Sequence, residues 1–215
     1  GTPTTVSSTS TNLRYVSVFN NQVYHTSATG FFKTNSPLPT TSVGSTSFAT
    51  VNDGYQFYFI NRGGTNWNIY LANGTSLNVL KYSSTDDGAT WTARGTLTVT
   101  GATGGVYGIV AQENAGNVDI YVTSPAALFK ATDAAAFNAN ISGTFSSIAT
   151  AATNTAFRGL AFSPNASGLL TSINSLNGFG YSGAGPSASQ SFNVSGSALS
   201  ANIVVTAPTN YEVSK

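Results

Sequence analysis

Ser84-Thr85-Asp86-Asp87-Gly88-Ala89-Thr90-Trp91 is the stretch that decides the fold of this chain. Short segments rich in strand-forming residues flank it on both sides. The polar side chains of Ser84 and Asp86 can accept hydrogen bonds from backbone N–H groups of a turn. Gly88 tolerates positive φ, and Trp91 supplies a large apolar ring that can pack beneath the turn. The stretch therefore predicts the turn of a β-hairpin.

This turn resembles the Asp-box, Ser-x-Asp-x-Gly-x-Thr-Trp, of sialidase-type and many other β-propellers. Every fixed position of the pattern is filled, by Ser84, Asp86, Gly88, Thr90 and Trp91. The resemblance implies a propeller and a structural role for these five residues. It implies no activity, because the Asp-box is a folding device. An ordinary Asp-Gly hairpin beside a tryptophan is the alternative.

An internal repeat supports the propeller. Val23–Lys33, Ile69–Lys81 and Ile120–Lys130 share one residue order, and their lysines lie 48 and 49 residues apart. Phe157-Arg158-Gly159-Leu160 similarly resembles Leu13-Arg14-Tyr15-Val16, which stands 144 residues earlier, or three times 48. A four-stranded propeller blade has roughly 40–50 residues. We therefore expect an all-β fold with a partial β-propeller of three to four blades.

Short runs of β-branched and aromatic residues fit the strands of such blades. Residues 55–60, 106–111, 118–122 and 160–162 are runs of this kind, bounded by Gly, Asn and Thr. Lys130–Ala139 contains several alanines, and we expect it to be a blade loop with one helical turn at most. No long helical periodicity is present.

The composition restricts the class of protein. Of 215 residues, 40% are hydrophobic and only 7% are charged, the net charge is +1, and there is no cysteine. Abundant aromatic residues argue against disorder, and the lack of a basic cluster argues against a nucleic-acid partner. No apolar run is long enough to span a membrane. A surface built from Ser, Thr, Asn and Gly indicates an extracellular or bacterial cell-surface location.

Two regions resemble modules of secreted bacterial proteins. Leu13–Phe19, Gln22–Ser27 and Ala151–Pro164 resemble segments of a Bacteroidota-like extracellular β-propeller family. The stretch that begins Leu176-Asn177-Gly178-Phe179-Gly180-Tyr181 resembles the first half of an Ig-like repeat of Bacteroidota surface proteins. These resemblances imply cargo of the outer-membrane (type IX) secretion route. They imply no molecular activity.

We accordingly expect three parts along the chain. Residues 1–164 would be blades from the C-terminal portion of a larger propeller, 165–175 a linker, and 176–215 the N-terminal half of an Ig-like domain. Within the last part, Ser191–Ser195 and Ala201–Thr206 alternate as strands do. A complete Ig-like sandwich needs about 100 residues. Its missing strands could come from the remainder of the polypeptide or from a neighbouring chain.

Arg14, Arg158 and Trp67 are the candidates for ligand binding. The two arginines occupy equivalent repeat positions and could face the axis of the ring, although the repeat favours a structural role for them, as hydrogen-bonding or snorkelling residues. Trp67 follows a loop and is the best candidate for an exposed contact with a sugar. Other strand aromatics, such as Tyr55 and Tyr107, are expected between blades.

The residues for catalysis or metal binding are scarce. His25 is the only histidine, and its place in an alternating strand predicts a surface position. Glu113 sits in a turn-like stretch with no tyrosine partner, so the sialidase nucleophile pair is missing. Asp119 and Asp133 lack the spacing of a calcium loop. We expect no catalytic residue, no metal and no cofactor.

Three functions remain open from the sequence. The leading hypothesis is a non-enzymatic extracellular binding or adhesion module, with glycans among its possible ligands. A sialidase-like glycoside hydrolase, completed by further blades, is the alternative. A structural surface protomer that shares strands between chains is the second alternative.

Overall fold

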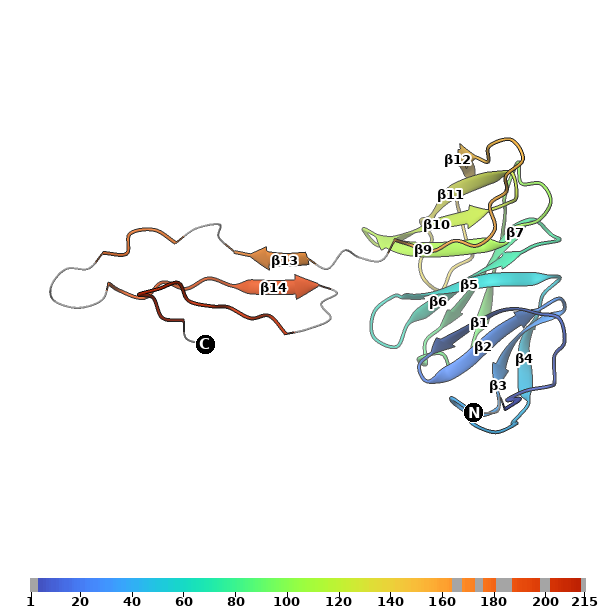
Figure 1. Cartoon of the computed structure of the whole chain (residues 1–215). Helices are drawn as coiled ribbons and strands as arrows, with labels where there is room; N and C mark the ends of the chain where they lie inside the picture. Colours follow the sequence, from blue (N-terminus) through green and yellow to red (C-terminus); the bar gives the residue numbers. More distant parts are fainter. Residues whose placement is uncertain (1–3, 164–167, 173–175, 181–186, 198–201, 214–215) are drawn as a thin grey trace. The chain divides into compact units, whose positions relative to one another are not determined.

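The computed structural model describes residues 4–163, 168–172, 176–180, 187–197 and 202–213. The chain divides into two compact units, Gly1–Phe162 and Ser163–Lys215. The described part is all-β, as predicted, and contains no helix. Its first unit holds three four-stranded antiparallel sheets, none of them closed on itself, which follow one another along the chain (Figure 1).

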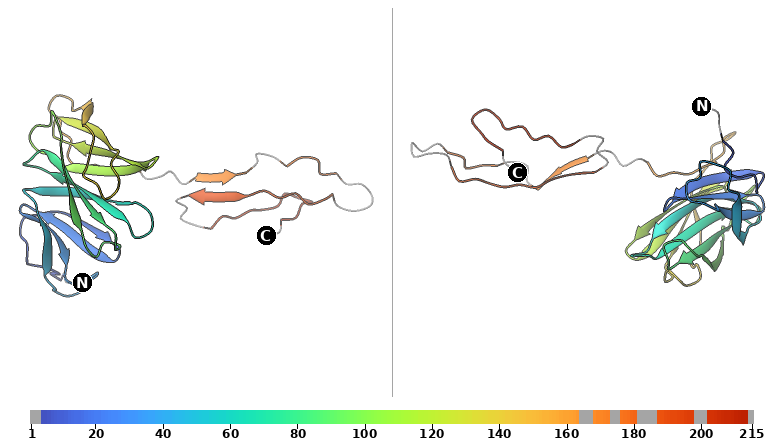
Figure 2. Two further views of the ribbon diagram at one scale, coloured as in Figure 1. Left: turned by 180° about the vertical axis from the view of Figure 1, so that it is seen from behind. Right: turned by 90° about the horizontal axis from the view of Figure 1, so that it is seen from below.

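Each of these sheets is a meander in which consecutive strands pair. Sheet 1 contains β1 (Leu13–Phe19), β2 (Gln22–Ser27), β3 (Gly30–Thr34) and β4 (Ser45–Thr50). Sheet 2 contains β5 (Gly54–Asn61), β6 (Trp67–Asn73), β7 (Asn78–Ser84) and β8 (Thr92–Thr98). Sheet 3 contains β9 (Gly108–Asn114), β10 (Asn117–Thr123), β11 (Ala127–Asp133) and β12 (Ser146–Thr150). The same succession is seen from behind in Figure 2.

The sequence repeat corresponds to a repeat of strand register. In every sheet a tyrosine of the second strand lies opposite a lysine of the third strand. The three pairs are Tyr24 and Lys33, Tyr70 and Lys81, and Tyr121 and Lys130. The three sheets therefore share one strand register around this tyrosine and lysine.

Two apolar clusters join the sheets. Sheets 1 and 2 meet through an aromatic cluster, in which Phe31 and Phe57 lie 4.6 Å apart between ring centroids. Sheets 2 and 3 meet through a mainly aliphatic cluster that includes Val79, Ile109 and Ile120, all fully buried. Burial of apolar surface is the dominant favourable term in folding, so these two junctions stabilise the stack of sheets.

The tyrosine and lysine of each repeat also bind the following sheet. Tyr24 donates to the carbonyl of Gly88 over 3.1 Å, and Lys33 donates to the carbonyl of Ala89 over 2.9 Å. Both acceptors belong to the turn after β7, the third strand of sheet 2. The first junction is thus held by hydrogen bonds as well as by aromatic packing.

The second junction repeats this arrangement with a buried charge. Tyr70 and Lys81 each donate to Oδ2 of Asp133 over 2.8 Å, and the two charged side chains are almost completely buried. Lys81 also reaches the carbonyl of Ala136. Burial raises the pKa of Asp133, but its hydrogen bonds with Lys81, Tyr70 and the Ser142 N–H outweigh burial and hold the pKa below its usual value.

The turn predicted for Ser84–Trp91 is present. Ser84 accepts from the backbone N–H of Gly88 over 2.9 Å, and Asp86 accepts from both the N–H and the hydroxyl of Thr90. Gly88 has a φ of 87°, as its role in the turn requires. Trp91 packs beside the turn and donates to the hydroxyl of Tyr24. These contacts confirm the predicted capping by Ser84 and Asp86.

Four expectations about segments of the first unit were wrong. Residues 160–162, which were expected to form a strand, are not in one. His25 is only 5% exposed, because residues 7–10 and Ser45 cover it; its Nε2 lies 3.0 Å from the Ser45 hydroxyl. Lys130–Asp133 belongs to β11 rather than to a loop, because these residues pair with Val118–Tyr121 of β10. Glu113 lies in β9 rather than in a turn, since it pairs with Val118.

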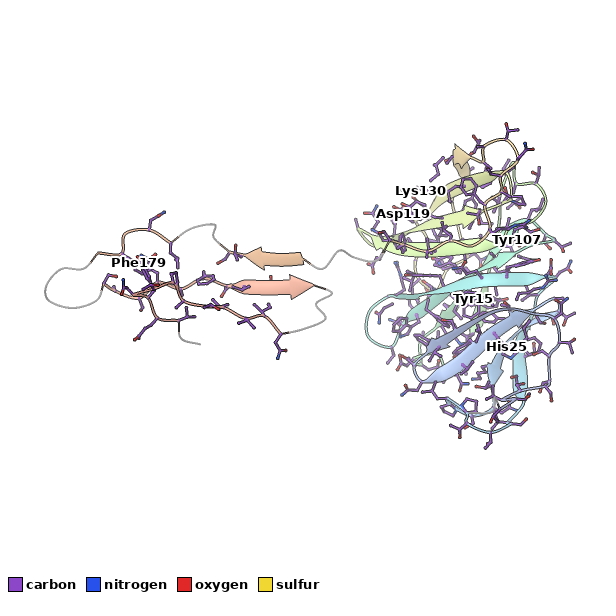
Figure 3. All side chains as sticks on the ribbon, in the orientation of Figure 1. Tyr15, His25, Tyr107, Asp119, Lys130 and Phe179 are labelled. Carbon is purple, nitrogen blue, oxygen red and sulfur yellow. The ribbon has the colours of Figure 1, made fainter. Side chains whose placement is uncertain are left out.

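The second unit contains one two-stranded sheet among its described residues. β13 (Gly168–Thr171) pairs with β14 (Val194–Ser197), so part of the predicted linker is a strand. Phe179 and Tyr211 pack edge to face at 5.4 Å, and Phe179 is labelled in Figure 3. Residues 202–206 are not in a strand, contrary to expectation, and residue 201 lies outside the described residues. The Ig-like assignment stays a prediction.

Replacing Lys81 by Met tests the buried ion pair. We expect the free energy of unfolding to fall by about 3–5 kcal/mol, because the Asp133 carboxylate would stay buried without its cation. Urea denaturation measures the change. Lys33→Met is the matched control, since the Lys33 ammonium binds one carbonyl at an exposed position. It should cost about 1 kcal/mol. Equal losses in the two variants would contradict a special role for Lys81.

Acid should weaken the turn through Asp86. Hydrogen bonds from the side chain and N–H of Thr90 lower the pKa of Asp86 from 3.8 to about 2. A group with a depressed folded pKa stabilises the fold above its unfolded pKa and loses this contribution as pH falls through the folded value. The melting temperature of the wild type should therefore fall more steeply than that of Asp86→Asn between about pH 4 and about pH 2. Parallel curves would remove Asp86 from the acid response.

Candidate functional site

Five residues from four segments meet at the ends of the first strands of the three sheets. We call Arg14, Asp53, Tyr55, Tyr107 and Arg158 the first-strand cluster. Arg14 lies in β1, and Tyr55 lies in β5. Asp53 directly precedes β5, and Tyr107 directly precedes β9. Arg158 lies in the segment that follows β12. The cluster brings together positions that are up to 144 residues apart in the chain.

Arg14 holds one half of the cluster. Its guanidinium donates to Oδ1 of Asp53 over 2.8 Å and to the hydroxyl of Tyr55 over 2.8 Å. Its Cζ also lies 4.9 Å from the centre of the Tyr55 ring. About a quarter of the side-chain surface of both Arg14 and Asp53 remains exposed. A partly exposed Arg and Asp keep polar atoms available to a ligand.

Tyr107 and Arg158 form the other half. The rings of Tyr55 and Tyr107 meet edge to face at 4.5 Å, and Cζ of Arg158 lies 5.7 Å from the centre of the Tyr107 ring. Tyr107 is labelled in Figure 3. Arg158 makes no ion pair within the described residues. Its cation therefore has no carboxylate partner there, whereas the cation of Arg14 does.

An open hollow of about 370 Å³ lies beside the cluster. Asp53 and Tyr107 contribute to its wall, and Thr75 adds a hydroxyl that lies 3.4 Å from Oδ2 of Asp53. The remaining lining residues are Gly74, Leu77, Gly104 and Gly105. The hollow thus offers a carboxylate, a hydroxyl and an aromatic ring over a shallow surface.

Tyr55 suits binding better than nucleophilic attack. Burial raises the pKa of Tyr55, and the negative charge of Asp53 raises it further. A nucleophile needs a lowered pKa or an adjacent general base, so this environment disfavours a reactive phenolate. The cluster also holds a single carboxylate, whereas glycoside hydrolysis ordinarily uses two.

The structure brings two of the three predicted ligand-binding residues together and separates the third from them. Arg14 and Arg158 do come to the same place, on either side of the two tyrosines. Trp67 lies apart from them and is half-buried against Phe19, with ring centroids 4.6 Å apart, while its indole N–H donates to Asp87. Trp67 is therefore committed to the junction between sheets 1 and 2.

The carboxylates considered for calcium are engaged with protein groups. Asp119 accepts from Thr132 over 2.6 Å and pairs with Lys130 at 2.9 Å (Figure 3). Asp133 is bound by Lys81 and Tyr70. These contacts give both aspartates structural partners of their own.

Asp53 and Thr75 were not predicted from the sequence as residues of the site. Asp53 stands in Asn52-Asp53-Gly54, which reads only as a turn, and its φ of 70° fits that reading. Its pairing with Arg14 depends on the packing of β5 against β1, which no local pattern encodes. The one available signal was the repeated Arg, since an inward-facing cation needs an acidic partner nearby.

Comparisons with protein-family models, curated proteins and solved structures found no match to this chain. Among the described residues, no helix has the length and apolar character needed to cross a membrane.

Proposed function

We propose that the chain is a non-enzymatic extracellular binding module that recognises glycans at the first-strand cluster and its hollow. The observation that carries this proposal is the meeting of Arg14, Asp53, Tyr55, Tyr107 and Arg158 from four separate segments. A structural hydrogen-bonding role would require none of the exposed polar atoms that line the hollow. Binding sites commonly combine aromatic walls with a few convergent polar groups.

The chemistry of the hollow fits a sugar. Asp53 can accept and Thr75 can donate or accept hydrogen bonds from ring hydroxyls. The Tyr107 ring offers an apolar face to the C–H side of a pyranose. Arg158 does not line the hollow but lies 5.7 Å from the Tyr107 ring, and it has no carboxylate partner among the described residues. It favours a sugar that carries a carboxylate. Acidic glycans are accordingly the preferred ligand class.

The architecture and the composition support a binding role outside the cell. Successive four-stranded sheets with one register are typical of propeller blades, and propellers present ligand sites where their first strands converge. The resemblance of residues 176–215 to an Ig-like repeat would make that part a spacer. A surface with few charged residues and the resemblance to Bacteroidota modules favour export through the type IX route and display at the cell surface.

Binding to a glycan array tests the proposal directly. The intact chain should bind glycans that contain uronic or sialic acids, and isothermal titration with the best array ligand should give saturable binding. Tyr107→Ala should weaken binding by at least about tenfold, equivalent to about 1.4 kcal/mol. Arg158→Ala should weaken binding of acidic glycans more than binding of their neutral counterparts. Failure to bind any glycan on the array would overturn the proposal.

Trp67→Phe is the matched control for the aromatic contact. Trp67 lies outside the hollow, so this variant should bind the same glycan with unchanged affinity. Loss of binding in Trp67→Phe with retention in Tyr107→Ala would move the site to the first junction.

A sialidase-like hydrolase is the second candidate, favoured by the convergence of Arg14 and Arg158 beside two tyrosines. Such an enzyme would release the fluorophore from a fluorogenic sialoside, and Arg14→Ala would reduce the rate by at least about tenfold. The raised pKa of Tyr55 and the single carboxylate lead us to expect no turnover. If the wild type turned over the sialoside and Arg14→Ala did so more slowly, the protein would be an enzyme rather than a binding module.

A further inference from the structure

Residues 157–162 contact sheet 3 in the same way as the first residues of β5 contact sheet 1. Thr26 of sheet 1 donates through its hydroxyl to the carbonyl of Tyr55 over 2.7 Å. Thr123 occupies the corresponding position in sheet 3, and its hydroxyl donates to the carbonyl of Arg158 over 2.7 Å. Arg158 therefore stands where Tyr55 stands in the first junction.

Side-chain packing gives the same alignment. Phe59, four residues after Tyr55, meets the ring of Tyr24 edge to face at 5.3 Å. Phe162, four residues after Arg158, meets the ring of Tyr121 edge to face at 6.2 Å. Tyr24 and Tyr121 are the equivalent tyrosines of their sheets, so residues 157–162 follow the path of a first strand.

Gly108 allows this segment to approach sheet 3 closely. A Cβ at Gly108 would lie 2.7 Å from the backbone nitrogen of Leu160 and 2.8 Å from the carbonyl carbon of Gly159. Neither backbone atom can move without shifting the segment. The glycine thus provides the space in which the segment lies.

The segment is not in a strand, and most of its backbone N–H groups are unpaired in the part of the chain that the structure describes. Leu160 is an exception, since its N–H and its C=O both bind the side chain of Gln56. Within the described residues, the backbone N–H groups of Arg158, Gly159, Ala161 and Phe162 have no hydrogen-bond acceptor. β5, by contrast, pairs along its length with β6. Unpaired backbone N–H groups along a segment are a template for an incoming strand.

The outer face of sheet 3 carries the equivalents of a tyrosine and an apolar residue that are buried in the other two sheets, and of a lysine that donates to the following sheet there. Tyr24, Phe31 and Lys33 of sheet 1, and Tyr70, Val79 and Lys81 of sheet 2, contact or are covered by the following sheet. Their equivalents in sheet 3 are Tyr121, Leu128 and Lys130, and none of these is fully buried.

Lys130 differs from the equivalent lysines because, within the described part of the chain, it binds no residue of another sheet. Lys33 and Lys81 donate to loop carbonyls of the next sheet, and Lys81 adds a carboxylate. Lys130 instead pairs with Asp119 of its own sheet, and 36% of its side-chain surface is exposed. Its ammonium also lies 5.5 Å from the centre of the Tyr121 ring.

We propose that residues 157–162 are the first strand of a fourth sheet, and that they and the outer face of sheet 3 bind a three-stranded antiparallel segment of this same repeat. The incoming segment would pair its first strand with the edge of 157–162. It would cover Tyr121 and Leu128 with apolar side chains and place the turn after its second strand against Lys130. Strands β6–β8 have this chemistry, because they complete β5 in the same way.

An intact sheet of a second copy does not fit the same place. Such a sheet brings its own first strand, and residues 157–162 already occupy that position on sheet 3. The partner is therefore a segment that lacks a first strand, and its recognition is independent of glycan binding.

A synthetic peptide of residues 65–98, which spans β6–β8, tests the proposal with the intact chain. Fluorescence anisotropy of the labelled peptide should show saturable binding, and hydrogen exchange of the amides at 158–162 should slow on addition of the peptide. Gly108→Ala and Lys130→Ala should each weaken binding by at least about tenfold. Lys33→Ala, the same residue type in an occupied junction, should leave binding unchanged. A scrambled peptide should not bind.

A second arrangement removes the need for the peptide to fold on its own. In this variant a copy of residues 60–98 is inserted directly after Phe162, which is equivalent to Phe59. The inserted strands should resist limited proteolysis and raise the melting temperature by several degrees. Gly108→Ala in the same variant should restore both cleavage and the original melting temperature. Absence of peptide binding together with full cleavage of the inserted copy would overturn the proposal.

Discussion

A tyrosine and a lysine that face each other across two strands hold each sheet to the next. In the first junction Tyr24 and Lys33 donate to carbonyls of a turn, and in the second Tyr70 and Lys81 donate to a buried Asp133. Apolar packing alone would tolerate small shifts between sheets, whereas these donors require an acceptor at one position. The relative placement of all three sheets therefore depends on one repeated pair.

This placement also creates the first-strand cluster. Because each sheet is set against the previous one in the same way, β1, β5 and β9 come to lie next to one another. Arg14 can then reach Asp53 on the neighbouring strand, and Tyr55 can meet Tyr107 on the next one. The site is a consequence of the repeat, although every hydrogen bond and ring contact between the five residues of the cluster joins two different repeats.

The local features of the fold could be predicted from the sequence, and the contacts between repeats could not. The turn at Ser84–Trp91 followed from residue types, and the equivalence of the three lysines followed from their periodic spacing. The burial of His25 did not, because it depends on a distant segment that folds over β2. Likewise the repeat suggested that Arg14 and Arg158 are equivalent, but not that two tyrosines separate them.

The buried charge of the second junction has a different role from the apolar packing around it. A buried ion pair stabilises a fold little compared with apolar side chains of the same volume, yet breaking it is costly. Lys81 and Asp133 therefore add little net stability and strongly penalise any other register of sheets 2 and 3. Lys130 occupies the same position one sheet later and keeps its charge by pairing with Asp119 at the surface. We infer that the repeated lysine specifies where the following sheet must place its loop, while the apolar side chains supply the energy that holds it there.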